Sequence, residues 1–167
     1  TDVICTDKTG TLTRNEMTVS RVYVDGLDVE ITGIGYEPKG DFHYKTSSKD
    51  RDITSEPKDL DLLLKTAVLC NDASFDYKNN KATVIGDPTE ACLLVLAEKK
   101  GIDTKEITEK FKRVDELQFD SVRKMMSVVC SDGNDNIVYT KGAPEKLLEL
   151  CSSIQINGKV IPLTEEH

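Results

Sequence analysis

Apolar residues recur along this chain with a period of two in some segments and with a helical period in others, which predicts both strands and helices. Alternating valines and an isoleucine flank an Asp-Gly pair typical of tight turns, so we expect a hairpin over residues 19–31. Leucine, alanine and valine at helical spacing predict a helix over residues 55–71. A second helix is expected over residues 87–101, because an aspartate N-cap and a first-turn proline open it and a glycine closes it.

The remaining apolar runs are shorter and predict strands that pair with their neighbours in sequence. Three runs between residues 117 and 140 are expected to form antiparallel strands, and a turn at residues 79–81 is expected to join two more. Asn157-Gly158 predicts a final hairpin. The expected fold is therefore α+β, with a mainly antiparallel twisted sheet flanked by helices. The other expected strands and short helices are 3–5, 117–119, 126–130, 137–140, 103–112 and 143–151.

One long segment, residues 33–58, is rich in Gly, Ser, Lys, Asp and Pro. Such clusters are typical of loops, so we expect a polar connection over most of this segment. No chemistry is assigned to it.

Composition narrows the range of functions. The 167 residues include 38% apolar and 31% charged residues, as expected for a folded domain with a core. A formal charge of −8 argues against nucleic acid as a partner, because phosphate backbones require clustered lysine and arginine. Five scattered cysteines without a C-x-x-C pair argue against a disulfide framework or a zinc site. The first residue is Thr1 rather than methionine, so we expect a piece of a longer protein.

The string D-K-T-G-T-L-T at residues 7–13 carries the clearest chemistry. Asp7 follows a short apolar run and precedes a glycine-containing loop, where its carboxylate could attack a phosphoryl group and form an acyl phosphate. Lys8 could neutralise charge on that group, and Thr11 could donate a hydrogen bond to it. Such a transfer also requires Mg²⁺, held by hard oxygen ligands that include Asp7.

The same string could be only a capped turn, since Asp, Thr and Gly all favour turns. That alternative suits Asp7 alone, but a chance match to all seven residues is on the order of one in ten million. The string is the signature of P-type ATPases, and this chain closely resembles that family. Related phosphatases carry a second aspartate where this chain has Thr9, and a threonine cannot activate water. The resemblance therefore implies a long-lived phosphoenzyme. It also implies that Thr9 joins Asp7 as a Mg²⁺ ligand in the intact pump.

Four further segments resemble successive blocks of the nucleotide-binding domain of this family, and with the signature they extend over nearly the whole chain. The pattern is most similar to the calcium-pump branch in a compact, bacterial form. The four blocks are C-N-D-A at 70–73, G-D-P-T-E-A at 86–91, F-D-S-V-R-K-M-M-S at 119–127 and K-G-A-P-E at 141–145.

Several residues of these blocks have side chains suited to a nucleotide. Phe119 offers a flat apolar face for an adenine ring, although a lone phenylalanine on a strand is more often a core residue. Lys124 and Lys141 lie near strand ends, where their ammonium groups could reach the ring and the phosphates, although lone lysines are usually solvated. Gly142 beside Lys141 could let the backbone approach a ligand closely.

Glu90 has two competing interpretations. As the third residue of a helix capped by Asp87, it could close a capping box. The resemblance instead implies that Glu90 lies at the adenine edge and accepts a hydrogen bond from the exocyclic amine. Thr89, Arg123 and Met126 also resemble pocket positions of the family.

One position departs from the pattern of animal calcium pumps. An arginine commonly follows the stacking phenylalanine by two residues there, whereas this chain has Ser121. A basic phosphate contact from that position is therefore in doubt, and whether Arg123 replaces it stays open.

The resemblance implies an ATP-binding domain, residues 17–167, behind the start of a phosphorylation domain, residues 1–16. The intact protein would be a multi-pass membrane pump, expected in a bacterial plasma membrane, that uses ATP and Mg²⁺ to form an aspartyl phosphate and move a cation, with Ca²⁺ the best match. Its partners would be the remaining phosphorylation, actuator and transmembrane domains of the same polypeptide, and not nucleic acid.

Two other functions compete with this one. A stand-alone nucleotide-sensing module would have no need for D-K-T-G-T-L-T, and a soluble phosphatase is disfavoured by Thr9. The T-G-D and G-D-G-x-N-D blocks that the family uses for Mg²⁺ and phosphate do not occur in the 167 residues. We therefore expect Asp7 in this chain to lack its catalytic partners, so that the chain binds ATP without turning it over.

Overall fold

The computed structural model describes residues 2–3, 5, 16–46, 56–78 and 81–167. The first sheet contains β1 (Arg21–Val24), β2 (Leu27–Ile31) and β3 (Phe42–Thr46), paired antiparallel in that order. Asp25 and Gly26 both have positive φ, 55° and 72°, as a two-residue turn between twisted strands requires. The predicted first hairpin is therefore confirmed.

Strand β3 is a feature that we did not expect, because residues 33–58 were predicted to be a polar connection. Phe42 pairs with Ile31, Tyr44 pairs with Val29, and both aromatic side chains pack against the core. These two residues alternate with His43 and thus give a short strand inside a polar stretch. The prediction failed because two aromatic side chains suffice to bury one face of a strand.

The described residues contain four helices. Three of them begin within one residue of the predicted start, and the first begins five residues later than predicted, at Leu60. Helix α2 (Pro88–Lys99) is capped by the Asp87 carboxylate, which accepts the Thr89 N–H at 2.7 Å. Helix α3 (Thr104–Lys110) is capped in the same way by Asp103, and it ends earlier than predicted because a strand begins at Lys112. The other two are α1 (Leu60–Leu69) and the short α4 (Pro144–Leu150).

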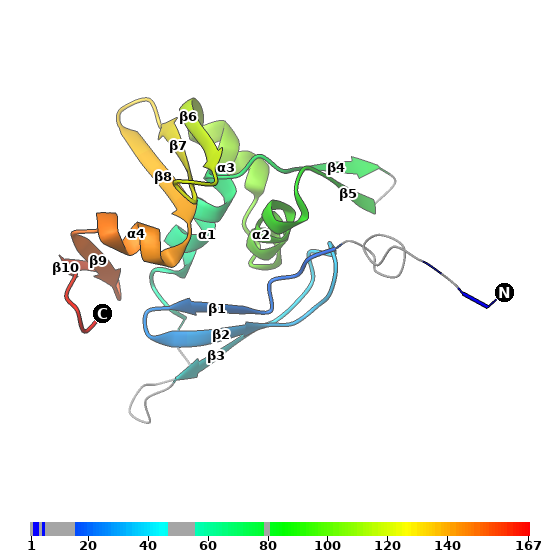
Figure 1. Ribbon diagram of the computed structural model, residues 1–167, viewed down its shortest axis with the longest axis horizontal. Coiled ribbons are helices and arrows are strands. Elements are labelled where there is room, and N and C mark those ends of the chain that lie inside the picture. Colours follow the sequence, from blue (N-terminus) through cyan, green and yellow to red (C-terminus); the bar gives the residue numbers. More distant parts are fainter. Residues whose placement is uncertain (1, 4, 6–15, 47–55, 79–80) are drawn as a thin grey trace.

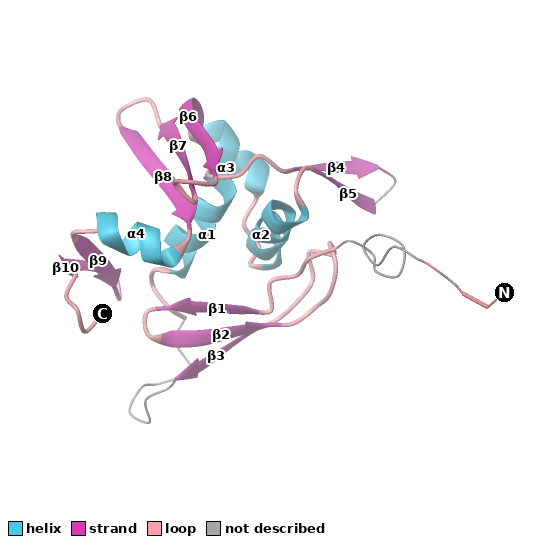
Figure 2. Ribbon diagram, viewed as in Figure 1, coloured by secondary structure: helices cyan, strands magenta, loops and turns pink. Residues whose placement is uncertain are grey.

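The second three-stranded sheet contains β6 (Lys112–Asp120), β7 (Met125–Ser131) and β8 (Asn136–Gly142). Two separate hairpins complete the described elements: β4 (Ser74–Lys78) with β5 (Lys81–Ile85), and β9 (Ser153–Ile156) with β10 (Lys159–Pro162). The expected α+β fold is confirmed, and all strand pairs in the described residues are antiparallel (Figure 2).

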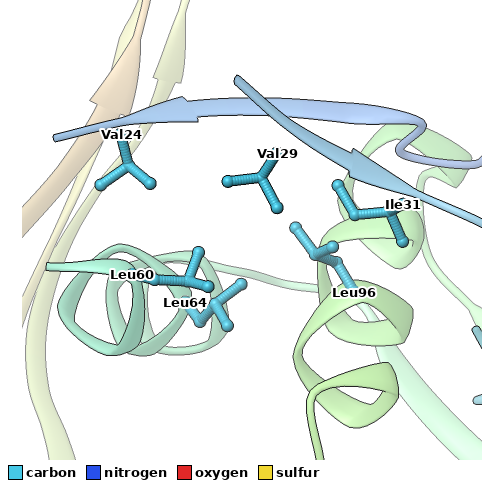
Figure 3. Packing of buried hydrophobic residues seen from close by; sticks show 6 residues of the cluster. All are labelled: Val24, Val29, Ile31, Leu60, Leu64 and Leu96. Atoms are coloured by element: carbon cyan, nitrogen blue, oxygen red, sulfur yellow. The ribbon is translucent and has the colours of Figure 1, made fainter. Parts of the chain in front are cut away.

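Helices α1 and α2 lie between the two three-stranded sheets (Figure 1). On one side, Leu60 and Leu64 of α1 and Leu96 of α2 pack against valines and an isoleucine of β1 and β2 (Figure 3). On the other side, Leu69 and Cys70 at the end of α1 pack against β7 and β8. Both sheets therefore depend on the same helix, and the loop that leaves α1 lies directly against the second sheet.

Candidate nucleotide-binding site

Three of the predicted site residues fall in one row across the second sheet. Met126 of β7 pairs with Lys141 of β8, and cross-strand partners share a face of the sheet. The register of β6 against β7 shifts between Leu117 and Asp120, so Phe119 lies in a bulge opposite Met126. The strands thus place Phe119, Met126 and Lys141 side by side although they are far apart in sequence.

The members of this row differ in exposure. The Phe119 side chain is 66% exposed, which is unusual for a large aromatic residue on a strand and leaves it accessible to a ligand. Met126 is only 1% exposed and packs in the core with Val128 and Tyr139. The Met126 side chain is therefore buried, and a nucleotide could not reach it in this structure.

Lys141 forms an ion pair with Glu90, the third residue of helix α2. The Lys141 Nζ lies 2.5 Å from Glu90 Oε1, and both side chains are largely buried. The other oxygen of Glu90 accepts the backbone N–H of Asp72 at 3.2 Å. The Glu90 carboxylate is thus turned toward the sheet and the loop after α1, rather than back to the N–H of Asp87 as a capping box requires.

The loop between β6 and β7 carries the other two predicted cations. The Asp120 carboxylate accepts the N–H groups of Val122 and Arg123, and Lys124 follows with a positive φ of 55°. Lys124 is exposed and lies 3.7 Å from Glu145 of α4. Its ammonium group therefore stays at the surface, beside α4.

Arg123 is not gathered with the other site residues. Its guanidinium donates to the Ser127 hydroxyl at 3.2 Å, and Ser127 also accepts a bond from Thr140. Because successive residues of a strand point to opposite faces, Ser127 lies on the face opposite Met126. The structure therefore places Arg123 on the other side of the sheet from Lys141.

Gly142 has a packing role in addition to any role near a ligand. A Cβ at this position would lie 2.4 Å from the Lys124 carbonyl oxygen and 2.6 Å from Met125 Cγ. The neighbouring Ala143 N–H donates to the same Lys124 carbonyl oxygen at 3.0 Å. Only a glycine lets the end of β8 come this close to the β6–β7 loop.

Thr89 lies in the first turn of α2, beside Glu90. Its N–H and hydroxyl serve as donors: the N–H to Asp87, and the hydroxyl to the Met17 sulfur at 3.4 Å. Hydrogen bonds from Thr89 hold the pKa of the Asp87 carboxyl below its usual value. The start of α2 thus presents an anionic cap next to the Glu90–Lys141 pair.

A buried thiol lies under the same pair. Cys70, at the end of α1, donates to the Met126 carbonyl oxygen at 3.5 Å, and burial raises the pKa of its thiol. A protonated, buried cysteine packs as a small apolar residue. Cys70 therefore supports the floor of the site without offering a nucleophile.

Two neighbouring features were not predicted as parts of the site: the Asn71-Asp72 loop and Arg113. Asn71 and Asp72 hold Glu90, and Arg113 in turn contacts both of them. The C-N-D-A block at 70–73 was noticed in the sequence, but nothing in it indicated which residue it would contact. Arg113 lies outside every block and gave no signal.

The four predicted residues of the phosphorylation motif, Asp7, Lys8, Thr9 and Thr11, lie outside the described residues. Within the described part of the chain, no group of three or more His, Cys, Asp and Glu side chains is arranged to hold a metal ion. What the described site offers is an exposed aromatic face beside a lysine held by a carboxylate. These groups are suited to binding a ring and an anion.

Comparison with known proteins identifies the family. A family model described as the cytoplasmic domain N of P-type ATPases matches residues 59–167, which include Glu90, Phe119 and Lys141. The chain belongs to the P-type ATPase family. The match supports the predicted family and its nucleotide-binding domain.

Individual members of the family align over nearly the whole chain. A calcium-transporting ATPase of Bacillus subtilis is 36% identical over 166 residues, covering 99% of this chain. A cation-transporting ATPase (pma1) of Synechocystis is 37% identical over 164 residues and 96% of the chain, and calcium-transporting ATPase type 2C member 1 of Bos taurus is 36% identical over 174 residues and 99%. The chain spans only 17–18% of the length of these relatives.

These relatives are several times longer than the chain, which aligns with one part of each of them. In the described residues, no helix is both long enough and apolar enough to cross a membrane.

Proposed function

We propose that this chain binds ATP and presents it for phosphoryl transfer within a cation-transporting ATPase. The observation that carries the proposal is the row formed by exposed Phe119 and by Lys141, which is held by Glu90 at 2.5 Å. An exposed aromatic ring can stack on adenine, and the ammonium group of a lysine beside it can bind an electron-rich ring edge or a phosphate. Lys124, exposed in the β6–β7 loop, would add a second cation for the phosphates.

Glu90 has capacity to contact the nucleotide while it holds Lys141. Each carboxylate oxygen accepts one hydrogen bond, from Lys141 and from Asp72, and each has a further lone pair. Thr89 lies in the same helical turn, with its hydroxyl at the surface. An exocyclic amine of adenine could therefore donate to Glu90 without displacing Lys141.

The chemistry of the whole pump is part of the same proposal. Asp7 would accept the terminal phosphoryl group, Lys8 and Thr11 would stabilise its charge, and Thr9 with Asp7 would hold Mg²⁺, which neutralises charge on the phosphates when bound. Residues 17–167 would carry the nucleotide to this aspartate, and residues 1–16 would begin the phosphorylation domain. The named relatives transport calcium or cations, and we propose Ca²⁺ as the transported ion.

The binding site can be tested in the 167-residue chain by titrating ATP and following amide NMR shifts. We expect a dissociation constant of about 0.1–1 mM and shifts centred on residues 119, 124 and 141. Phe119→Ala and Lys141→Ala should each weaken binding about tenfold. Leu117→Ala is the matched control, since Leu117 is 60% exposed on the same strand but pairs with Ser127 on the other face. Unchanged affinity in both site variants would refute the proposed site.

We further propose that this chain does not turn ATP over by itself, because the 167 residues lack the T-G-D and G-D-G-x-N-D blocks. Phosphate release from ATP should stay at the uncatalysed level, and Asp7→Asn should leave both this level and ATP affinity unchanged. A steady-state ATPase rate that disappears in Asp7→Asn would contradict the proposal.

A further inference from the structure

Arg113, near the start of β6, is bound to the loop that follows helix α1. Its guanidinium donates to the Asn71 carbonyl oxygen at 2.5 Å and to the Asp72 carboxylate at 2.7 Å. It also pairs with the Glu116 carboxylate at 2.7 Å and reaches the Leu69 carbonyl oxygen at 3.4 Å. A planar guanidinium with several donors can fix a loop in this way, whereas a single ammonium group cannot.

The loop held by Arg113 in turn holds Glu90. The backbone N–H of Asp72 donates to Glu90 Oε2 at 3.2 Å. The Asn71 side-chain amide donates to the backbone carbonyl oxygens of Glu90 at 2.9 Å and Ala67 at 3.1 Å. Asn71 is only 6% exposed, so this amide is committed to the two carbonyl groups. Both the main chain and the carboxylate of Glu90 therefore depend on the position of the loop.

Glu90 is the last link before Lys141. The 2.5 Å ion pair connects two side chains whose exposed fractions are 18% and 26%, so water competes weakly for their charges. A shift of the loop would move the Glu90 carboxylate and leave Lys141 free to adopt other rotamers. Long lysine side chains are disordered unless a partner fixes them.

We propose that Arg113 is a positioning residue of the nucleotide site. It fixes the Asn71-Asp72 loop, the loop fixes Glu90, and Glu90 orients the ammonium group of Lys141. This inference rests on the proposed ATP-binding function, because Lys141 is the group that meets the nucleotide. Arg113 itself acts through the loop and does not touch the ligand.

A double-mutant cycle separates this role from a general contribution to folding. Arg113→Met should weaken ATP binding about three- to tenfold, and Arg113→Lys should restore only part of the loss. In a Lys141→Met background, Arg113→Met should change the affinity by less than about twofold, because its effect passes through Lys141. Arg21→Met is the matched control, since Arg21 forms an exposed pair with Glu30 in the first sheet and should leave the affinity unchanged.

A second measurement needs no nucleotide. The Nζ chemical shift of Lys141, observed by ¹⁵N NMR in the free protein, should move in Arg113→Met and in Glu90→Gln but not in Arg21→Met. If the parent chain fails to bind ATP, the proposed function is wrong, while this shift still tests the link from Arg113 to Lys141. If Arg113→Met does not fold, Arg113→Lys, which keeps the charge and loses the planar fork, takes its place in both measurements.

Two results would overturn the inference. One is a folded Arg113 variant with parental ATP affinity and an unmoved Lys141 resonance. The other is a full, additive loss when Arg113→Met is combined with Lys141→Met, since additivity indicates independent roles.

Discussion

Single residues of the site differ in how well the sequence indicated their roles. Phe119 could be identified because its block resembles the family, and the structure adds that it is 66% exposed. Met126 is separated from it by a bulge and is 1% exposed. The bulge in β6, which brings Phe119 opposite Met126, leaves no trace in a single sequence. The burial of Met126 itself follows the alternation of Met126, Val128 and Cys130 along β7.

Arg123 and Arg113 show the same limit for charged residues. Arg123 stands in a recognised block and yet binds Ser127 on the opposite face, while Arg113 stands in none and holds the loop beside Glu90. A charged residue on or beside a strand gives no periodic signal for the partner that it will find. Only the three-dimensional arrangement distinguishes the two arginines.

Gly142 leads to a prediction about stability. Gly142→Ala would place a methyl group 2.4 Å from the Lys124 carbonyl oxygen, so β8 must move away from the β6–β7 loop. We expect the free energy of unfolding to fall by about 2–3 kcal/mol, measured by urea denaturation.

Gly133→Ala is the comparison for this prediction. Gly133 has a positive φ of 96° in the turn before β8, and a Cβ there meets no atom within 4 Å. Backbone strain alone should cost about 1 kcal/mol at that position. Equal losses in the two variants would show that crowding at Gly142 does not limit stability.

At the scale of elements, the predictions succeeded where local chemistry decides the structure. The Asp25-Gly26 and Asn157-Gly158 turns and the Asp87 cap all have the backbone geometry that these residue types favour. Strand β3 was missed because it depends on pairing with β2 and on burial of Phe42 and Tyr44. Long-range pairing is not encoded in a short window of sequence.

The last hairpin is held to the rest of the domain by two aspartates. Asp25 accepts the Asn157 N–H at 2.6 Å, and Asp59 accepts the Gly158 N–H at 3.0 Å and the Gln155 side-chain amide at 2.5 Å. Asp59 is the N-cap residue of α1, but its carboxylate makes no capping hydrogen bond and accepts bonds from the hairpin instead. The start of α1 and the β9–β10 turn are thereby joined.

Acid should release this hairpin. Hydrogen bonds from Gly158, then from Gln155, lower the pKa of the Asp59 carboxyl below its ordinary value of 3.8. A lowered pKa in the folded state means that Asp59 contributes stability above 3.8 and loses it as the pH falls through the folded-state value. The protection factors of the Asn157 and Gly158 amides, which compare the observed exchange rates with the intrinsic ones, should therefore fall when the pH is lowered from about 6 to about 3.

Substitution provides the control for the acid effect. Asp59→Asn should weaken protection of the Gly158 amide at neutral pH and remove most of its acid dependence. Asp132→Asn changes a carboxyl whose pKa is also lowered, by the N–H groups of its own turn, and should not affect the hairpin. Parental protection at Gly158 in Asp59→Asn would argue against the link.

At the scale of the whole molecule, helix α1 joins the described core clusters. Leu60 and Leu64 pack against the first sheet, Val68 against α2, and Leu69 against the second sheet. Because one ten-residue helix serves all three clusters, the two sheets should unfold together. The family could be recognised from short motifs, whereas this dependence on a single helix is visible only in the packing.

Cooperative unfolding predicts that ATP, as a ligand of the folded state, raises the melting temperature of the whole domain. A ligand that binds only the folded state, present at ten times its dissociation constant, stabilises that state by about 1.4 kcal/mol. In a chain of this size, this stabilisation raises Tm by roughly 3–6 °C. Because both sheets share α1, ATP should shift one single transition, including signals from the first sheet, which contains no site residue. Differential scanning calorimetry combined with NMR of the Val29 methyl groups tests this. Phe119→Ala should abolish most of the shift at the same ATP concentration, and a melt that separates into two transitions would disprove the shared core.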